Sequence, residues 1–501
     1  MGLTDSIKNL LGIRPVNIGQ LNAEAVRARP EKLHKISIPQ VKNTKNHLDD
    51  IEVTQEYLLI QKLIENDCPV VFVTGKAGTG KSTLIVYLRH ILKKRTAVVA
   101  PTGVAALQAK GVTIHSFFQL PPKIIDANDI KRVYDRKLYS KLELLIIDEI
   151  SMVRGDLIDG IDKFLRKNRE NEKPFGGVQL LLIGDLFQLP PVVMKEERNV
   201  LNKKGYSSEF FFSALTLQES DMIPVELTKV FRQESKEFIH LLNNVRIAED
   251  LDNSLRGINS RFAQDYSPEL EITLTGTNQL ADQKNSKKLF ALPGKEHVFQ
   301  GVMKGKFSYS KDKLPSPYRL KLKVGAQVMF TKNDEQKRWV NGTLGIVKSL
   351  GTNSIRVEII SDGPIATYDV LKITWGTYRY EYDPDRDKIV SKVVGEYTQY
   401  PLMLAWAITI HKSQGKTLPK VFINMGSGAF APGQVYVALS RVQSLNDIHL
   451  ARPIKNSEVM CDPKIKRFYQ ALKRMRQKDS IGEQAHSPDG EKRGGADAAS
   501  S

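Results

Sequence analysis

The sequence predicts an α/β protein built on a doubly wound parallel sheet, interrupted by a region of antiparallel strands. Two observations support this. Apolar runs typical of buried parallel strands alternate with helical segments in the first half of the chain, and one run leads into a glycine-rich loop. Between about residues 324 and 400 the pattern changes to short alternating segments, after which the α/β pattern returns.

The composition is that of an ordinary globular protein, 41% hydrophobic and 26% charged. A formal net charge of +18 favours a polyanionic partner without identifying it. Two cysteines, Cys68 and Cys461, are too few for a disulfide framework or a zinc cluster. We see neither an apolar run of roughly eighteen residues nor a secretory signal, so we expect no membrane contact and a cytoplasmic location, on the nucleoid if the source is bacterial.

Residues 1–50 hold basic residues and prolines without an apolar period, which predicts a loosely structured basic extension. A helical pattern starts near Thr54. Gln55 could read the edge of an adenine, because its amide carries both a donor and an acceptor. It could equally be a solvated glutamine at a helix start, and the residues alone leave both interpretations open.

The glycine-rich loop reads G-x-x-x-x-G-K-[ST] and lies between an apolar run at 70–73 and a helical segment. Its backbone N–H groups and the helix N-terminus are suited to bind phosphate oxygens. Lys81 would reach the β- and γ-phosphates, and Ser82 would hold magnesium. A glycine-rich turn that matched by chance would not be expected to have both a buried strand before it and a helix after it. The residues expected around the nucleotide are Gly75, Lys76, Ala77, Gly78, Thr79, Gly80, Lys81, Ser82 and Thr83.

A second predicted strand, 97–100, leads into the segment that contains Thr102. His115 follows, close to Phe117 and Phe118. A histidine beside aromatics could contact phosphate and stack on bases. A buried phenylalanine pair with an incidental histidine is the interpretation that these residues alone favour.

Two further apolar runs end in polar side chains that suit ATP hydrolysis. The run 144–147 ends in Asp148, placed to hold magnesium, and Glu149, placed to accept the proton of an attacking water. A surface loop is the alternative, but it would not be paired with a phosphate-binding loop in the same chain. The run 179–183 leads to Gln188, a candidate γ-phosphate sensor.

The second half of the chain starts a new pattern near residue 225 and becomes β-like between 324 and 400, which predicts a small β-barrel. Asn341-Gly342 and residues 362–364 are turn signals. Its tyrosines and basic residues could stack on nucleic acid, although barrel core and surface charge explain them more simply. The α/β pattern returns at 404–415, and residues 456–501 predict a basic helix and a disordered tail.

The segments GKAGTGKST, APTGVAA, TIHSFF, IIDEISM, GDLFQLPPV, FRQ, TIHKSQGKTL and VYVALSR together resemble the motif series of superfamily 1 helicases of the 5′→3′, RecD-like branch. Residues 231–246 resemble the signature of the petite-integration-frequency (Pif-type) DNA helicases. The resemblance covers about residues 51 to 455 and follows the order of the family's motifs.

This resemblance implies two RecA-like P-loop domains with ATP between them. The first would span residues 51–225, with a wedge insertion at 113–142 that splits the duplex. The second would comprise 226–323 and 401–455, interrupted by a β-barrel insertion, Src-homology-3-like, at 324–400. Residues 1–50 and 456–501 lie outside the resemblance.

The resemblance also implies roles for single residues. Lys81, Asp148, Glu149 and Gln188 take the roles given above, with Ser82 and Asp148 on the metal. The remaining implied residues are the arginine fingers Arg232 and Arg441, Gln55 and Gly415 at the nucleotide, and Thr102, His115, His411 and Ser413 at the DNA strand.

The implied function is an ATP-dependent 5′→3′ DNA helicase that uses magnesium and acts on single-stranded and forked or tailed duplex DNA as a monomer when free. The family also unwinds RNA–DNA hybrids and G-quadruplexes and serves replication, repair, recombination and telomere maintenance. An ATP-driven translocase that strips bound proteins with little unwinding is the alternative. A nucleotide-dependent DNA-binding switch fits less well, because it needs no catalytic Glu149 or arginine fingers. A small-molecule phosphotransferase would need no strand contacts.

Overall fold

The computed structural model describes residues 51–472, with gaps at 219, 221, 264–265, 267–269, 308–313 and 361–364. Of the described residues, 51–462 belong to one compact unit, and the helical residues 463–472 belong to another. The predicted extension at 1–50, the turn at 362–364 and the tail beyond 472 lie outside the described residues. No helix in the described ranges is long and apolar enough to cross a membrane.

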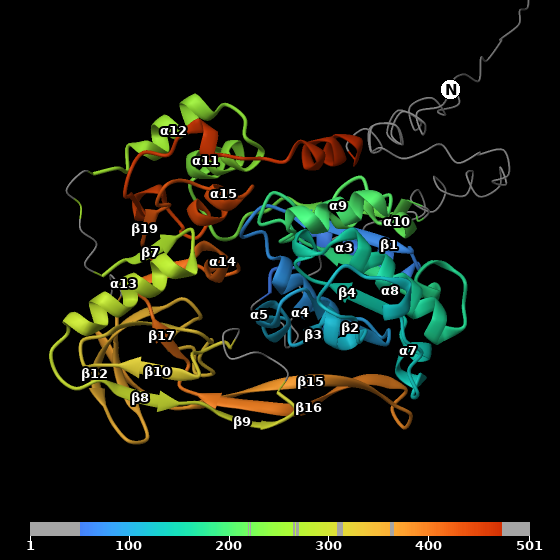
Figure 1. Ribbon diagram of the computed structural model, residues 1–501, viewed down its shortest axis with the longest axis horizontal. Coiled ribbons are helices and arrows are strands. Elements are labelled where there is room, and N and C mark those ends of the chain that lie inside the picture. Colours follow the sequence, from blue (N-terminus) through green and yellow to red (C-terminus); the bar gives the residue numbers. More distant parts are fainter. Residues whose placement is uncertain are drawn as a thin grey trace, which may run out of the picture. The chain divides into compact units, whose positions relative to one another are not determined.

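A six-stranded parallel sheet forms the first α/β domain, in the order β3-β2-β4-β5-β1-β6 (Figure 1). Strands β1, β4 and β5 are buried along their whole length, as expected for apolar runs covered by helices on both faces. The predicted α/β class with a parallel sheet is therefore confirmed. The strands are β1 (Val70–Gly75), β2 (Thr96–Ala100), β3 (Val112–Thr113), β4 (Leu144–Ile147), β5 (Gln179–Ile183) and β6 (Met222–Leu227).

Helices of this domain connect the strands and carry polar caps where the sequence provides them. Thr54 caps α3 by accepting a hydrogen bond from the N–H of Tyr57. The segment 113–142, where we expected the wedge, consists of short helical turns: α6, η2 and α7. The helices are α3 (Gln55–Glu65), α4 (Lys81–Ile91), α5 (Gly103–Gln108), α6 (Ile114–Phe117), η2 (Ala127–Asp129), α7 (Lys137–Lys141), η3 (Ile150–Met152), α8 (Gly155–Arg169), η4 (Pro174–Gly177), α9 (Lys195–Lys203), η5 (Phe211–Ser213) and α10 (Leu215–Gln218).

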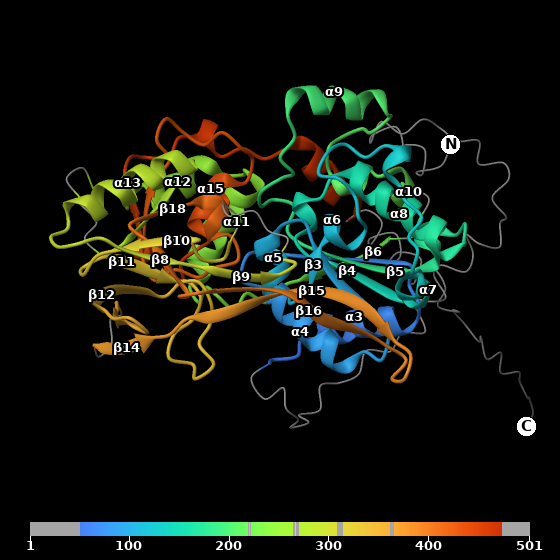
Figure 2. The ribbon, with the colours of Figure 1, turned by 60° about the horizontal axis from the view of Figure 1, so that its bottom comes forward.

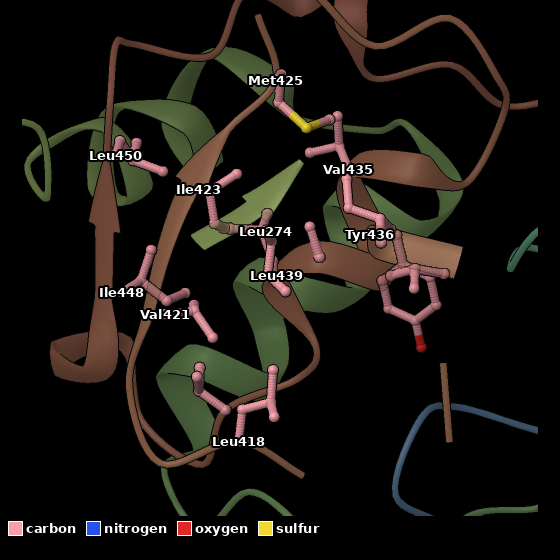
Figure 3. Packing of buried hydrophobic residues seen from close by; sticks show 14 of the residues in the cluster. Leu274, Leu418, Val421, Ile423, Met425, Val435, Tyr436, Leu439, Ile448 and Leu450 are labelled. Carbon is pink, nitrogen blue, oxygen red and sulfur yellow. The ribbon is translucent and has the colours of Figure 1, made fainter. Parts of the chain in front are cut away.

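A second parallel sheet, β18-β7-β19-β20, belongs to the second α/β domain. Its core packs strand residues such as Leu274 and Ile423 against Val435 and Leu439 of α15 (Figure 3). The strands are β7 (Ile272–Thr275), β18 (Ala407–Thr409), β19 (Val421–Asn424) and β20 (Ile448–Leu450). The helices are α11 (Lys236–Ile247), α12 (Leu251–Asn259), α13 (Asn278–Ala291), α14 (Ile410–Ser413), α15 (Gln434–Leu439), η7 (Leu445–Asp447) and η8 (Asn456–Glu458).

Antiparallel sheets form the region inserted between β7 and β18. They are a five-stranded sheet β14-β13-β12-β11-β17, a three-stranded sheet β15-β16-β9 and the pair β10-β8. These strands begin at His297, before the boundary that we expected at 324, because the short stretches at 297–305 alternate too briefly to be recognised in the sequence. The strands are β8 (His297–Gln300), β9 (Val302–Gly305), β10 (Arg319–Leu322), β11 (Gln327–Phe330), β12 (Leu344–Leu350), β13 (Ile355–Ile359), β14 (Ala366–Val370), β15 (Ile373–Asp383), β16 (Lys388–Gln399) and β17 (Leu402–Leu404).

The long β15–β16 hairpin runs from the insertion alongside the first sheet (Figure 2). The hydroxyl of Tyr380 accepts a hydrogen bond from the N–H of Val98 at 3.1 Å, and its ring packs edge-on against Phe117. At the hairpin tip, both carboxylate oxygens of Asp387 accept from Arg95, at 2.7 and 2.8 Å. The contacts by which the hairpin joins the insertion to the first α/β domain thus include a buried one and an exposed one.

Candidate active site

The glycine-rich loop joins β1 to α4 in the conformation that a phosphate-binding loop needs. Gly78 and Gly80 have φ angles of +81° and +83°, which L side chains rarely adopt. A Cβ added to Gly78 would lie 2.5 Å from the Cβ of Arg232. The first N–H groups of α4 point out of the helix end with no side-chain cap at Gly80. The residues present thus fit the phosphates of ATP.

Lys81 is the first residue of α4, and its ammonium group lies inside the loop. Its Nζ donates to the carbonyl oxygens of Gly75 and Lys76, at 2.8 and 2.9 Å. Burial lowers the pKa of Lys81, while Asp185 and Glu149 act in the opposite direction. A cation held in this position is suited to bind the phosphate oxygens that the loop would enclose.

Two carboxylates follow β4 directly. Burial and the neighbouring Glu149 raise the pKa of Asp148 to about 7. Burial also raises the pKa of Glu149, although Lys81 and Arg441 favour its charged form. Glu149 stands at φ +50°, and its Oε2 accepts a hydrogen bond from the amide of Gln414 at 3.1 Å. A carboxylate oriented in this way could position a water molecule.

Magnesium would depend on few protein ligands here. The described residues contain no group of three or more His, Cys, Asp or Glu side chains placed around one ion. Ser82 is exposed in the first turn of α4, and Asp148 lies at the end of β4. One hydroxyl and one carboxylate suit magnesium, which usually keeps several waters and binds substrate phosphates.

Asp185 follows β5 and forms a buried ion pair with Arg246 from α11. The two side chains are 0% and 5% exposed and lie 2.9 Å apart. Burial acts to raise the pKa of Asp185, but Arg246 and Lys81 outweigh it and lower that pKa. Arg246 also lies over the ring of Phe187, at 4.4 Å. This pair joins the two ATPase domains immediately beside Lys81.

Tyr436 of α15 also crosses to the first domain. In Figure 3 its hydroxyl points away from the apolar cluster that holds its ring. That hydroxyl accepts from the N–H of Ala77 at 2.8 Å and donates to Asp185 at 3.3 Å. The tyrosine therefore links the glycine-rich loop, the Asp185–Arg246 pair and the second domain's core.

Gln188 lies in the same loop as Asp185 and is buried. Its amide nitrogen lies 3.4 Å from Asp185 Oδ2, and its Oε1 accepts from Gln414 at 3.4 Å. Gln414 thus contacts both Glu149 and Gln188 from the second domain. Gln188 is placed between the two domains, as a γ-phosphate sensor would be.

The two expected arginine fingers lie near the loop but donate to carbonyl oxygens of their own domain. Arg232 donates to the hydroxyl of Thr417 and to the carbonyl of Ser440, both at 3.0 Å. Arg441 is 1% exposed and donates to the carbonyls of Val437 and Ser413, at 2.7 and 3.2 Å. Burial lowers the pKa of Arg441 to about 9. Reaching a phosphate would require both side chains to exchange these partners.

Gln55 and Gly415, which we also expected at the nucleotide, take no part in the contacts of the glycine-rich loop described above. Gln55 is exposed at the first residue of α3. The residue of that helix that touches the loop is Tyr57, whose hydroxyl donates to the carbonyl of Gly80 at 2.6 Å. Gly415 has φ +77° and follows α14, where it allows the chain to turn.

Two expected strand contacts in the first domain make local hydrogen bonds. The hydroxyl of Thr102 accepts from the N–H of Ala105 and so caps α5. His115 Nδ1 lies 3.2 Å from the carbonyl of Leu120. Its neighbours Phe117 and Phe118 are buried, as the simpler interpretation of those residues predicts.

The two expected strand contacts in the second domain differ in exposure. His411 is exposed on α14. Ser413 is fully buried, and its hydroxyl donates to the carbonyl of Ile410 at 2.7 Å. The structure therefore presents His411 at the surface and uses Ser413 to complete the helix turn.

Five side chains of this site were not expected from the sequence: Tyr57, Asp185, Arg246, Gln414 and Tyr436. All but Tyr57 lie inside the motif segments quoted above. Their polar side chains amid apolar motif positions are the signal that could have drawn attention to them. Their partners are far away in sequence, which no local pattern reveals.

Comparison with protein families gives two matches. The family model described as PIF1-like helicase matches residues 52–254, and the model described as DNA helicase Pif1, 2B domain matches residues 311–350. The first match contains the glycine-rich loop and both carboxylates, and the second lies in the antiparallel insertion. The insertion is thus similar to the 2B domain of that family.

Two curated relatives illustrate the similarity. ATP-dependent DNA helicase RRM3 of Saccharomyces cerevisiae is 30% identical, over 87% of this chain and 69% of its own length. ATP-dependent DNA helicase Pif1 of Bdellovibrio bacteriovorus is 32% identical, over 80% of this chain and 88% of its own. The chain spans between 61% and 65% of the matched PIF1 helicases of Emericella nidulans, human, mouse and rat.

Solved structures show the same similarity. Pif1 of Bacteroides sp in complex with ADP-AlF4 is 39% identical, with a TM-score of 0.76, and the match covers 86% of this chain and 98% of that one. Pif1 from Bacteroides in complex with ADP-AlF3 and single-stranded DNA is 40% identical, with a TM-score of 0.62, over 85% and 98%. Both matches extend over most of this chain.

Proposed function

The chain belongs to the PIF1-like helicase family, a family of ATP-dependent DNA helicases, and on that premise we propose that it translocates 5′→3′ on single-stranded DNA and unwinds duplexes. The observation that carries the proposal is the set of contacts from the second ATPase domain onto the glycine-rich loop and the catalytic carboxylate. Tyr436 contacts Ala77, and Gln414 contacts Glu149. A motor needs such contacts, because they let the state of the nucleotide change the relation between the domains.

We assign residue roles on the same basis. Lys81 binds the phosphates, Ser82 and Asp148 hold magnesium, and Glu149 orients or deprotonates the attacking water. When bound, magnesium would neutralise charge on the β- and γ-phosphates. Gln188 senses the γ-phosphate. The remaining assignments are Arg232 and Arg441 as arginine fingers, Gln55 and Gly415 at the nucleotide, and Thr102, His115, His411 and Ser413 at the strand.

ATP would supply new acceptors for Arg232 and Arg441, which now donate to carbonyl oxygens. Closure of the domains around the γ-phosphate would exchange those partners, and hydrolysis would remove the reason for closure. If each domain holds the DNA strand in turn, one cycle advances the enzyme. We place the first ATPase domain at 51–225 and the second at 226–323 with 401–455, apart from β8, β9, β10 and β17, which belong to the antiparallel insertion.

The DNA partners follow from the same premise. The related Bacteroides helicase has been solved with single-stranded DNA, which supports single-stranded DNA and tailed duplexes as ligands of this chain. RNA–DNA hybrids and G-quadruplexes are further candidates from the family. Phosphate contacts would make binding largely independent of sequence and dependent on salt.

The test is strand separation on two partial duplexes, one with a 5′ and one with a 3′ single-stranded tail, with ATP and magnesium. We expect unwinding of the 5′-tailed duplex alone. Unwinding of only the 3′-tailed duplex would contradict the direction. ATP hydrolysis stimulated by DNA without unwinding would favour a translocase that strips bound proteins.

The matched control is Lys81→Ala. It removes the ammonium group that lies inside the loop, so we expect ATP turnover to disappear while the variant still binds single-stranded DNA. Turnover near that of the unchanged protein would contradict the assignment of this loop as the ATP site.

A further inference from the structure

A groove runs along α13 on the second ATPase domain, away from the residues assigned above. It has a volume of about 680 Å³. We call it the α13 groove, and the side chains that matter for the argument come from β7, α13 and the end of β19. They are Thr273, Thr275, Lys284, Lys287, Lys288 and Asn424.

The groove exists because α13 is anchored over one side of its sheet. The amide of Asn285 donates to the carbonyl of Ala407 and accepts from its N–H, at 2.7 and 2.9 Å, which fixes the helix to β18. On that face of the next strands, Thr273, Thr275 and Phe422 are buried, whereas Asn424 at the end of β19 is exposed. Figure 1 shows α13 lying diagonally beside β7 and β19.

The α13 groove lies on the sheet face opposite to α15. Leu274 belongs to the core that packs against α15. Side chains alternate along a strand, so its neighbours Thr273 and Thr275 face the other way, towards α13. The groove is therefore separated from Arg441 and the nucleotide site by the thickness of the sheet.

The charge of the α13 groove is positive and uncompensated within its lining. Lys284 is half-buried; its Nζ donates to Thr273 Oγ1 at 2.6 Å and lies 5.5 Å from the centre of the Phe422 ring. Burial and then Lys288 lower the pKa of Lys284. Lys287 and Lys288 lie beside it at the three- and four-residue spacing of one helix face. The described lining residues include no carboxylate.

The lining of the groove reaches the edge of the sheet where the expected strand contacts begin, at Thr275 and Asn424. Thr409, Thr275 and Asn424 are paired at the same level of β18, β7 and β19. The residue after Thr409 starts α14, which carries the exposed His411. Carboxyl ends of parallel strands are where open α/β sheets bind ligands. A strand that passes His411 could thus continue into the groove.

We propose that the α13 groove binds the phosphodiester backbone of a single nucleic-acid strand. Three lysines along one helix face, with the exposed amide of Asn424 opposite, suit a row of phosphates rather than a single base. The inference rests on the proposed DNA function and adds a contact surface to it. Such contacts hold the strand without reading its sequence.

The test is the salt dependence of oligonucleotide binding in the triple variant Lys284→Gln/Lys287→Gln/Lys288→Gln. Each lost phosphate contact reduces the slope of log affinity against log salt by about 0.7 for a single strand, so we expect a slope flatter by about 2. Fluorescence anisotropy of a labelled mixed-sequence 20-mer, without nucleotide, measures it. The double variant Lys287→Gln/Lys288→Gln keeps the half-buried Lys284 and should flatten the slope by about 1.4 if the triple variant fails to fold.

The control variant is Lys163→Gln/Lys195→Gln/Lys203→Gln. It also removes three positive charges, but from exposed positions on α8 and α9. If the salt-dependence slope flattens equally in the control and the groove variant, or in neither, the groove is not a DNA-binding surface. Failure of the unchanged protein to bind the oligonucleotide overturns the proposed function instead. The groove variant could instead lose binding of tripolyphosphate while its slope of log DNA affinity against log salt stays unchanged. That result would contradict a nucleic-acid strand as the ligand and favour a small phosphate compound.

Discussion

Two of the ion pairs that connect the first ATPase domain to later parts of the chain differ in burial. Asp185 and Arg246 are almost completely buried beside the nucleotide site. Arg95 and Asp387, which join the first domain to the hairpin tip, are 20% and 63% exposed. Water competes with the second pair but not with the first. The comparison indicates that the buried pair helps to hold the two domains together at the nucleotide site, whereas the exposed pair adds little to the contacts of the hairpin.

A further contact joins Lys416 of the second domain to Asn341 of the insertion, and its burial is intermediate between those of the two ion pairs. Lys416 is 8% exposed and donates to Asn341 Oδ1 at 2.8 Å. Burial alone lowers its pKa to about 8, because no carboxylate compensates its charge. This contact joins two regions at a cost in stability.

The largest effect should come from Asp185→Ala. It leaves the guanidinium of Arg246 buried without a counter-ion, which typically costs about 3–5 kcal/mol. We expect a matching fall in the free energy of unfolding, measured with urea, and loss of ATP turnover. The double variant Asp185→Leu/Arg246→Leu removes both charges and should recover much of the stability. A loss below about 1 kcal/mol in the single variant would contradict the importance of the pair.

Lys416→Met should raise the free energy of unfolding instead of lowering it, and the size of the increase should depend on pH. The pKa of Lys416 is lower in the folded protein than the ordinary value of 10.5, so the folded state carries the cost of the buried charge below pH 8. Raising the pH from about 8 to 10.5 relieves that cost in the unchanged protein and raises its stability.

The methionine variant lacks that cost at every pH, so we expect it to be more stable at pH 7, by on the order of 3 kcal/mol. The advantage should shrink above pH 8. Urea unfolding of both proteins at pH 7 and pH 9.5 measures it, and comparing the two removes the titration of all other groups. An advantage that does not change with pH would show that packing, not charge, produces it.

Tyr436→Phe tests the hydrogen bonds that an uncharged side chain makes between the two domains. It removes the hydroxyl that accepts from Ala77 and donates to Asp185, and leaves a buried donor and acceptor without that partner. We expect a loss of about 1–2 kcal/mol in the free energy of unfolding. Tyr378→Phe in the insertion is the control for removing a tyrosine hydroxyl elsewhere. Equal losses in both variants would argue against a special role for Tyr436.

The smallest effect should come from Asp387→Asn at the hairpin tip, which removes the charge that Arg95 contacts and leaves the pair of Arg95 with Glu143 in place. Exposed ion pairs contribute about 0–1 kcal/mol, and salt screens them. We expect a loss in that range at low salt that disappears near 1 M salt, measured by urea unfolding. A loss of several kcal/mol that is insensitive to salt would mean that the hairpin is bound as tightly as the nucleotide site.

The sequence predicted those parts of the site that follow one strand directly. Lys81 comes after β1, Asp148 and Glu149 after β4, and Gln188 after β5, so an apolar run and the residues behind it were enough to identify each. The parallel sheet then brings these strand ends to one edge. The fold class was predictable for the same reason, since buried parallel strands are visible as apolar runs.

The connections between the domains were decided by the tertiary structure. Arg246 meets Asp185 across 61 residues, and Tyr436 meets Ala77 across 359. Local periodicity contains no information about such distant partners. The lysines of α13 likewise resemble an ordinary solvated helix face in the sequence, and only the anchoring of α13 over β18 turns them towards a groove. Residues adjacent in the chain are positioned by local backbone geometry, whereas these contacts depend on how whole sheets pack.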